Sequence, residues 1–155
     1  MVDDITLSEL PEQPVAVIYG RVPPEGVAGF LGHAFGSVPP TLMRQGRTIV
    51  GPPFARYGVM NDHGWEVEAG FPVDEPVTAD GEVEPSALPA GQAARLVRAG
   101  PYGTVAEGWS TISAWVADNG YVVTQAPWEC YLDEPGVTDP RTLIVMPCGR
   151  PQSDS

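Results

Sequence analysis

The feature that most constrains this chain is an internal repeat. An offset of 74 residues superposes four pairs of turn-forming or aromatic residues, namely Gly46 on Gly120, Pro53 on Pro127, Phe54 on Trp128 and Tyr57 on Tyr131. Nearer the start of each half the offset is 78, because Pro23 falls on Pro101. A pattern that recurs at a fixed spacing predicts a structural unit that is present twice.

The first half reads as strand, helix, strand, strand. The segment 15–22 is rich in β-branched residues and is bounded by prolines, which is typical of a strand. The segment 25–37 has apolar residues three and four positions apart, so it predicts a helix, although its glycines weaken it. We expect Gly46 to open the next strand, which is either regular or bulged at the paired prolines. The alternating segment 64–73 is expected to form the last strand.

The second half has the same order. The segment 91–101 predicts a strand, and 104–118 predicts a helix with Thr104 as its N-cap and Gly120 as its stop signal. The segment 121–132 follows as a strand, and 141–148 is expected to be its hairpin partner.

These patterns predict an α+β fold built from duplicated β-α-β-β units. The 155 residues suit a single domain, 1–155, with repeat one at about 14–74 and repeat two at about 92–149. The acidic segment 74–91 is rich in proline and glycine and reads as a linker, and 150–155 as a flexible tail. Two such units packed about a pseudo-twofold axis would leave a ligand cleft between the halves.

The repeat is broken at Glu129, which falls on Ala55. An unpaired charge is costly to bury, so a carboxylate inside an apolar strand needs a reason. Alternation along a strand places Glu129 and Tyr131 on one face, with Ala55 and Tyr57 as their counterparts. This predicts a site with one carboxylate and tyrosines from both halves. The alternative is a strand-edge glutamate that faces solvent.

Aromatic side chains are the expected walls of such a site, because their faces stack on flat ligands and attract cations. Besides Tyr57 and Tyr131, the candidate ligand-binding residues are Phe54, Phe71, Trp109 and Trp128. Ordinary core packing is the alternative, and it applies most strongly to Trp109 and Trp115, which share the second helix.

The charge of the chain limits the classes of partner that we expect it to bind. It has 20 acidic and 8 basic residues, no lysine, and a net charge of -12. Direct nucleic-acid binding is not expected, because it requires a basic stripe that displaces counterions. An acidic field attracts cations, so a cationic small molecule is the simplest partner. Alternatively, the acidity only keeps the chain soluble.

Other classes of site find little support. His33 and His63 lack partners at metal-ligand spacing, and no GxSxG motif is present, so we expect neither a metal nor another cofactor. Cys130 and Cys148 are expected to be reduced, packed thiols close together on paired strands. The chain shows no apolar run of the ~18 residues that span a membrane and no signal peptide, which predicts a cytoplasmic protein without membrane contact.

The sequence resembles the GyrI-like small-molecule-binding family, which also supplies the effector-binding half of some multidrug-sensing transcription regulators. The resemblance covers nearly the whole chain, and its most specific part is Gly-Pro-Tyr at 100–102 followed by Trp-Glu-Cys-Tyr at 128–131. It implies a duplicated β-α-β-β fold with a ligand cleft. It also implies that Glu129 matches a strand glutamate with which relatives bind lipophilic, often cationic aromatic compounds.

The resemblance leaves three hypotheses open. The first is a stand-alone module that binds and sequesters hydrophobic, aromatic, often cationic compounds. The second is a hydrolase that opens the strained cyclopropane of DNA-alkylating natural products. In that case Glu129 removes a proton from the attacking water, and Tyr57 or Tyr131 donates a hydrogen bond to the developing oxyanion. The third is an inhibitory interaction with DNA gyrase. No helix-turn-helix precedes the first expected strand, so we do not expect the chain to read DNA by that device.

Overall fold

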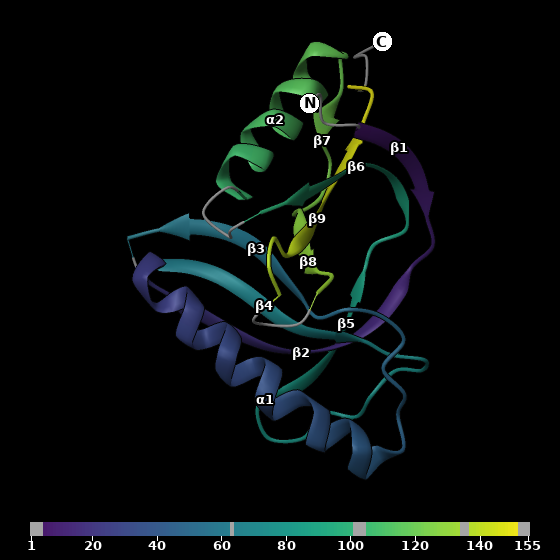
Figure 1. Ribbon diagram of the computed structural model, residues 1–155. Coiled ribbons are helices and arrows are strands. Elements are labelled where there is room, and N and C mark those ends of the chain that lie inside the picture. The colour runs from purple at the N-terminus through teal and green to yellow at the C-terminus, as the bar shows by residue number, and fades with distance from the viewer. Residues whose placement is uncertain (1–4, 63, 101–104, 134–136, 152–155) are drawn as a thin grey trace. The chain divides into compact units, whose positions relative to one another are not determined.

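The computed structural model describes residues 5–62, 64–100, 105–133 and 137–151. The chain folds into two compact units (Figure 1). We call Glu12–Pro89 the central unit, and Met1–Pro11 together with Ala90–Ser155 the terminal unit. The central unit contains the segment expected as repeat one together with most of the expected linker, and the terminal unit contains the segment expected as repeat two together with the beginning of the chain.

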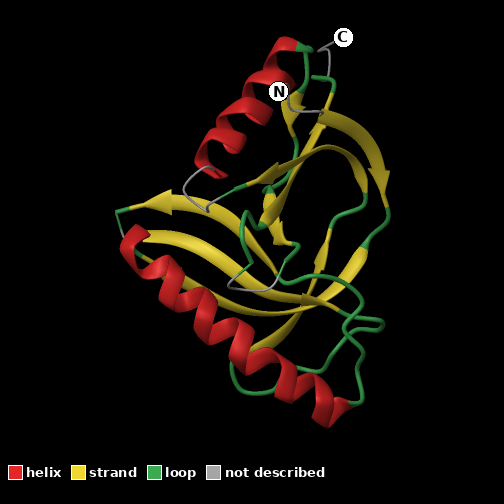
Figure 2. Cartoon of the chain, viewed as in Figure 1, coloured by secondary structure: helices red, strands yellow, loops and turns green. Residues whose placement is uncertain are grey.

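The central unit is an antiparallel sheet with one long helix. Its elements are β2 (Gln13–Val22), the short helix η1 (Pro24–Gly26), α1 (Val27–Gln45), β3 (Phe54–Asn61), β4 (Gly64–Pro72) and β5 (Val83–Leu88). The strand order is β5-β2-β4-β3. Helix α1 packs along β2 and β4 (Figure 2).

The core of the central unit follows from periodicity on both partners. Ala34, Val38 and Leu42 lie on one stripe of α1 and are buried against alternate residues of β2, including Ala16 and Ile18. Burial of this apolar surface, rather than intrinsic helix propensity, stabilises a helix that contains several glycines.

Helix α1 is longer than its sequence predicts. It was expected to end near residue 37 but continues to Gln45 through Pro39 and Pro40. Each proline lacks the N–H that would bond to the carbonyl four residues earlier, which weakens the helix at that point. Burial of Thr41 and Leu42 beyond the prolines offsets this loss.

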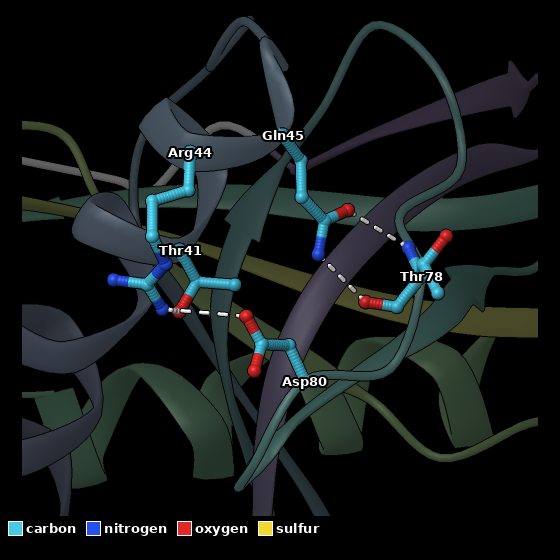
Figure 3. Close-up of polar contacts among 5 residues, drawn as sticks. All are labelled: Thr41, Arg44, Gln45, Thr78 and Asp80. Atoms are coloured by element: carbon cyan, nitrogen blue, oxygen red, sulfur yellow. Dashed lines mark hydrogen bonds and ion pairs between the residues drawn. The ribbon is translucent and has the colours of Figure 1, made fainter.

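Polar contacts hold the last turn of α1 against the segment that follows β4 (Figure 3). The Gln45 amide donates to the carbonyl of Thr78 at 2.8 Å and accepts from its backbone N–H at 2.9 Å. Arg44 forms an ion pair with Asp80 at 3.3 Å. These contacts form only when residues some 30 positions apart meet, so local sequence could not reveal them.

Two further expectations for the central unit are wrong. Gly46 does not open a strand. Instead it caps α1 in the left-handed region (φ 68°), and β3 begins only at Phe54. The expected linker at 74–91 contains β5, which pairs with β2. Its acidic residues are exposed while Val83 and Leu88 are buried, and an edge strand tolerates Pro85.

The terminal unit is also an antiparallel sheet with one helix. Its elements are β1 (Ile5–Leu10), β6 (Gly91–Ala99), α2 (Val105–Asp118), β7 (Val122–Val123), β8 (Trp128–Tyr131) and β9 (Arg141–Gly149). The strand order is β1-β6-β9-β8, and β7 also pairs with β9. Ile112 and Val116 of α2 are buried against Leu96, Ile144 and Met146.

Helix α2 agrees with the expected 104–118, and Gly120 follows it with φ 77°. The proposed N-cap Thr104 lies outside the described residues. The single strand expected at 121–132 is wrong, because it is split into β7 and β8. Strand β1 has no counterpart among the expected strands.

The two units have matching strand orders. β2, β3 and β4 occupy the places in the central unit that β6, β8 and β9 occupy in the terminal unit. The outer strand beside β2 is β5, and the outer strand beside β6 is β1. The topology therefore agrees with the repeat seen in the sequence, and the α+β class is confirmed.

The cysteines lie apart, contrary to expectation. Cys130 pairs with Leu143 of β9, five residues from Cys148, which is about 16 Å at the rise of a strand. Both are free thiols. Burial raises the pKa of Cys130 to about 12; the nearby Arg95 charge opposes this shift and Glu129 adds to it. Burial also raises the pKa of Cys148.

A substitution at Gly70 tests the close contact between β4 and β2. A Cβ at this position would overlap the carbonyl oxygen of Ala16, so the Gly70→Ala substitution must displace a strand. We expect it to lower the free energy of unfolding by about 1–3 kcal/mol. Gly29→Ala in α1 is the control, because nothing lies near its Cβ, and it should stabilise by roughly 0.5–1 kcal/mol. Urea unfolding measures both, and equal stabilities would contradict the packing described.

Thiol reactivity tests the burial of Cys130. A pKa near 12 leaves little thiolate at pH 8.5, whereas an unfolded cysteine is about half ionised there. In a Cys148→Ser variant, alkylation of Cys130 by iodoacetamide should be at least ~100-fold slower in the folded protein than in urea. Similar rates in both states would show that the thiol is accessible and ordinary.

Candidate functional site

The candidate site is built on β8, whose sequence is Trp-Glu-Cys-Tyr. Aromatic residues favour a half-buried strand, and this short strand pairs along its length with β9. Glu129 has only 8% of its surface exposed. The solvent-facing alternative for Glu129 is therefore wrong.

The register of β8 on β9 shows which face Glu129 occupies. Glu129 lies opposite Ile144, and Tyr131 lies opposite Thr142. Directly opposed residues share a face of the sheet, and Ile144 belongs to the core beneath α2. Glu129 and the half-buried Tyr131 therefore lie on the face covered by α2, which confirms that they share a face.

Trp128 and Cys130 occupy the other face of β8. Trp128 lies opposite Val145, and both are buried. Trp128 was a candidate ligand-binding residue, but the register directs it away from the face of Glu129. Trp109 lies on α2 and packs, partly buried, against the core on the same side as Glu129.

A polar row crosses this α2-covered face beside Glu129. Arg98 of β6 lies opposite Thr142 of β9, which in turn lies opposite Tyr131. The Arg98 guanidinium reaches α2, where it donates to the Thr111 hydroxyl at 3.3 Å and lies 3.9 Å from a Glu107 oxygen. The row adjoins the one that contains Ile144 and Glu129.

An ion pair closes the hairpin next to this row. The Arg141 guanidinium donates to both Asp133 oxygens at 3.0 Å, and its backbone N–H donates to the same carboxylate at 2.8 Å. These bonds hold the pKa of Asp133 below its ordinary value. They fix the end of the β8–β9 pairing and with it the position of Tyr131.

The counterpart of Glu129 in the central unit is apolar. Ala55 lies opposite Ala69, and Tyr57 lies opposite Val67, on the face covered by α1. Ala55 is fully buried, and the Tyr57 ring lies 5.4 Å from that of Trp65. The carboxylate therefore distinguishes one unit from the other.

The remaining aromatic candidates belong to the central unit. Phe71 packs against Phe35 in the core beneath α1, with ring centroids 5.8 Å apart. Phe54 is buried and lies opposite Gly70, on the face turned away from α1. That Tyr57 and Glu129 line one cleft stays a prediction.

Two polar residues of the terminal unit were not anticipated from the sequence. Arg98 and Thr142 continue the helix-facing stripes of core residues along their strands, namely Ala94 and Leu96 on β6 and Ile144 and Met146 on β9. A polar residue at the parity of a buried stripe was the available signal. This signal is ambiguous in the sequence, because the sequence does not show which side of each strand faces the helix.

The residues that the structure describes contain no cluster of histidine, cysteine and carboxylate side chains suited to a metal ion. His33 lies 3.0 Å from Glu82 on the exposed side of α1, and His63 falls outside the described residues. Within the described parts, neither helix combines the length and apolarity needed to cross a bilayer.

Comparisons with solved structures identify the fold. The C-terminal domain of EcmrR superposes with a TM-score of 0.81 at 24% identity, covering 97% of this chain and 99% of that one. A hydrolase from Listeria innocua gives 0.63 at 12% identity, with coverages of 94% and 91%. SAV2435 bound to tetraphenylphosphonium gives 0.62 at 12% identity, with 94% of each chain covered. At these identities the likeness concerns the fold alone.

A search of curated proteins finds no match. The model of the GyrI-like small-molecule-binding domain matches residues 3–147, nearly the whole chain. The resemblance noted in the sequence is thereby confirmed, and the chain belongs to the GyrI-like family of small-molecule-binding domains.

Proposed function

We propose that this domain binds hydrophobic, aromatic cations and that Glu129 supplies the countercharge. The observation that carries the proposal is the burial of a carboxylate, 8% exposed, on a helix-covered sheet face where the repeat has a fully buried alanine. Buried charges are expensive and cluster at functional sites. Because the chain belongs to a family of small-molecule-binding domains, contact with a ligand is the role that we assign to this carboxylate.

The surroundings of Glu129 suit a lipophilic ion. Ile144 lies directly opposite it, and Trp109 and Tyr131 flank the same side of the sheet. A charge contact in apolar surroundings is less screened than in water. Apolar burial, worth about 25 cal/mol per Å², would supply most of the affinity without demanding one ligand shape.

Tetraphenylphosphonium is a suitable probe, because SAV2435, which shares the fold, has been solved with that cation bound. It is rigid, hydrophobic and permanently charged, so its charge does not depend on pH. Tetraphenylborate has nearly the same shape and the opposite charge. The pair therefore separates the contribution of charge from that of apolar contact.

The Glu129→Gln substitution tests the countercharge. It preserves shape and hydrogen bonding, so tetraphenylphosphonium should bind more weakly by about 1–3 kcal/mol, or roughly 5- to 150-fold in Kd. Tetraphenylborate should bind equally or more tightly, because a repulsive charge is gone. Isothermal titration calorimetry measures both.

Glu9→Gln on β1 is the matched control, because it changes net charge equally at an exposed residue of the same unit. It should alter both affinities by less than about twofold. Loss of affinity for both ions in Glu129→Gln would mean that the residue acts through shape. No change for either ion would exclude Glu129 from the site.

A second candidate function is hydrolysis of a strained, electrophilic ring. It is favoured by the pairing of a buried carboxylate with a tyrosine, Tyr131, on one sheet face. The carboxylate would take a proton from water as the water oxygen attacks a ring carbon. The strained C–C bond at that carbon would break, its electron pair would move to a conjugated carbonyl oxygen of the substrate, and the tyrosine would donate a hydrogen bond to that oxygen as it becomes negative. The Listeria innocua structure described as a hydrolase shares the fold.

Mass spectrometry distinguishes binding from hydrolysis. If the domain is an enzyme, a neutral cyclopropanoid alkylator gains one water catalytically, and Glu129→Gln lowers turnover about 100-fold or more while retaining binding. If the domain only binds, no water-added product accumulates beyond one equivalent of protein. That result would remove the hydrolase candidate and leave the binding proposal intact.

A further inference from the structure

Thr142 is the most unusual polar residue on the α2-covered face. It has no exposed surface, and within the described parts of the chain its hydroxyl has no hydrogen-bond partner. A buried hydroxyl without a partner costs free energy, and most such groups in folded proteins are satisfied. Valine has the same shape and would fill this strand position without that cost.

The position of Thr142 connects it to the candidate site. It lies directly opposite Tyr131, and it precedes Ile144, the partner of Glu129, by two residues on β9. Diagonal neighbours on one face of an antiparallel pair lie about 7–8 Å apart at Cα, so one drug-sized molecule can reach both side chains. Its other cross-strand neighbour, Arg98, donates to Thr111 on α2.

We propose that Thr142 is a ligand-binding residue whose hydroxyl bonds to a hydroxyl or carbonyl group of the bound cation. This inference rests on the proposed function and narrows its ligand class to aromatic cations that also carry such a polar group. Thr142 has no exposed surface, so entry of that group requires neighbouring side chains to move.

A matched series of phosphonium ions tests the proposal. Tetraphenylphosphonium has no hydrogen-bonding group, whereas its 2-, 3- and 4-hydroxyphenyl analogues differ from it by one hydroxyl. In the unmodified protein, at least one analogue should bind about 3- to 10-fold more tightly than the parent ion, as one net hydrogen bond allows. Calorimetry gives this ratio for each protein variant.

The ratio should fall to about one in Thr142→Val and return in Thr142→Ser, which restores a hydroxyl. Thr6→Val, at an exposed threonine of β1, is the control and should keep the ratio of the unmodified protein. A ratio retained in Thr142→Val, or no analogue that binds more tightly than the parent, would overturn the proposal.

The stability of the free protein supplies a second readout that needs no ligand. Removing an unpartnered buried hydroxyl should leave the urea midpoint of Thr142→Val unchanged or higher. A lower midpoint would show that the hydroxyl is bonded inside the folded chain, and the proposal would be wrong. An unchanged affinity for tetraphenylphosphonium in Glu129→Gln would instead count against the proposed function. The two failures are therefore distinguishable.

Discussion

The pairing of β9 with β8 on one side and with β6 on the other is the interaction on which the candidate site depends. It fixes three strands in one register, so that Glu129, Ile144 and Leu96 form one row across the sheet and Tyr131, Thr142 and Arg98 form the next. A shift of one residue would turn every side chain of a strand to the other face. The buried apolar residues of β9 make such a shift costly, because Ile144 and Met146 would then leave the core.

The helix-covered face of the terminal unit combines two chemical environments. Toward one end it is an ordinary core of α2 against β6 and β9. Toward the first turn of α2 it becomes polar, with Arg98 bonded to the helix and Thr142 buried between Arg98 and Tyr131. The free-energy cost of burying polar groups is offset by the surrounding apolar packing. Such groups often occur at sites of specificity or binding. We propose this boundary as the place where a ligand with both apolar and polar parts binds.

The two units share a topology but differ at the position of the buried carboxylate. Gly46 and Gly120 end the two helices in the same left-handed conformation, and Tyr57 and Tyr131 lie on corresponding strands. The common fold tolerates either alanine or glutamate at 55 and 129, since strand pairing uses backbone groups. The chemistry of the site can therefore change without disturbing the architecture.

Several elements differ from the predictions made from local sequence, and each difference has a physical cause. Helix α1 passes Pro39 and Pro40 because Leu42 is buried and Gln45 bonds to Thr78, contacts that exist only after the chain has folded. Strand β5 was hidden among acidic residues because an edge strand needs few buried side chains. The strand expected at 121–132 is split in two, and the register of β8 on β9 places Cys130 opposite Leu143 rather than near Cys148.

The sequence by itself determined the α+β class, the second helix and the shared face of Glu129 and Tyr131, and it contained the repeated pattern with which the two strand orders agree. These features rest on short-range periodicity, which the order of residues encodes directly. Only the tertiary structure decided that this face is the one beneath α2, that Glu129 is buried, and that Arg98 and Thr142 lie in the adjoining row. Strand register brings together residues more than ten positions apart. It is selected by the free energy of burying apolar side chains across strands, and no local sequence pattern contains this information.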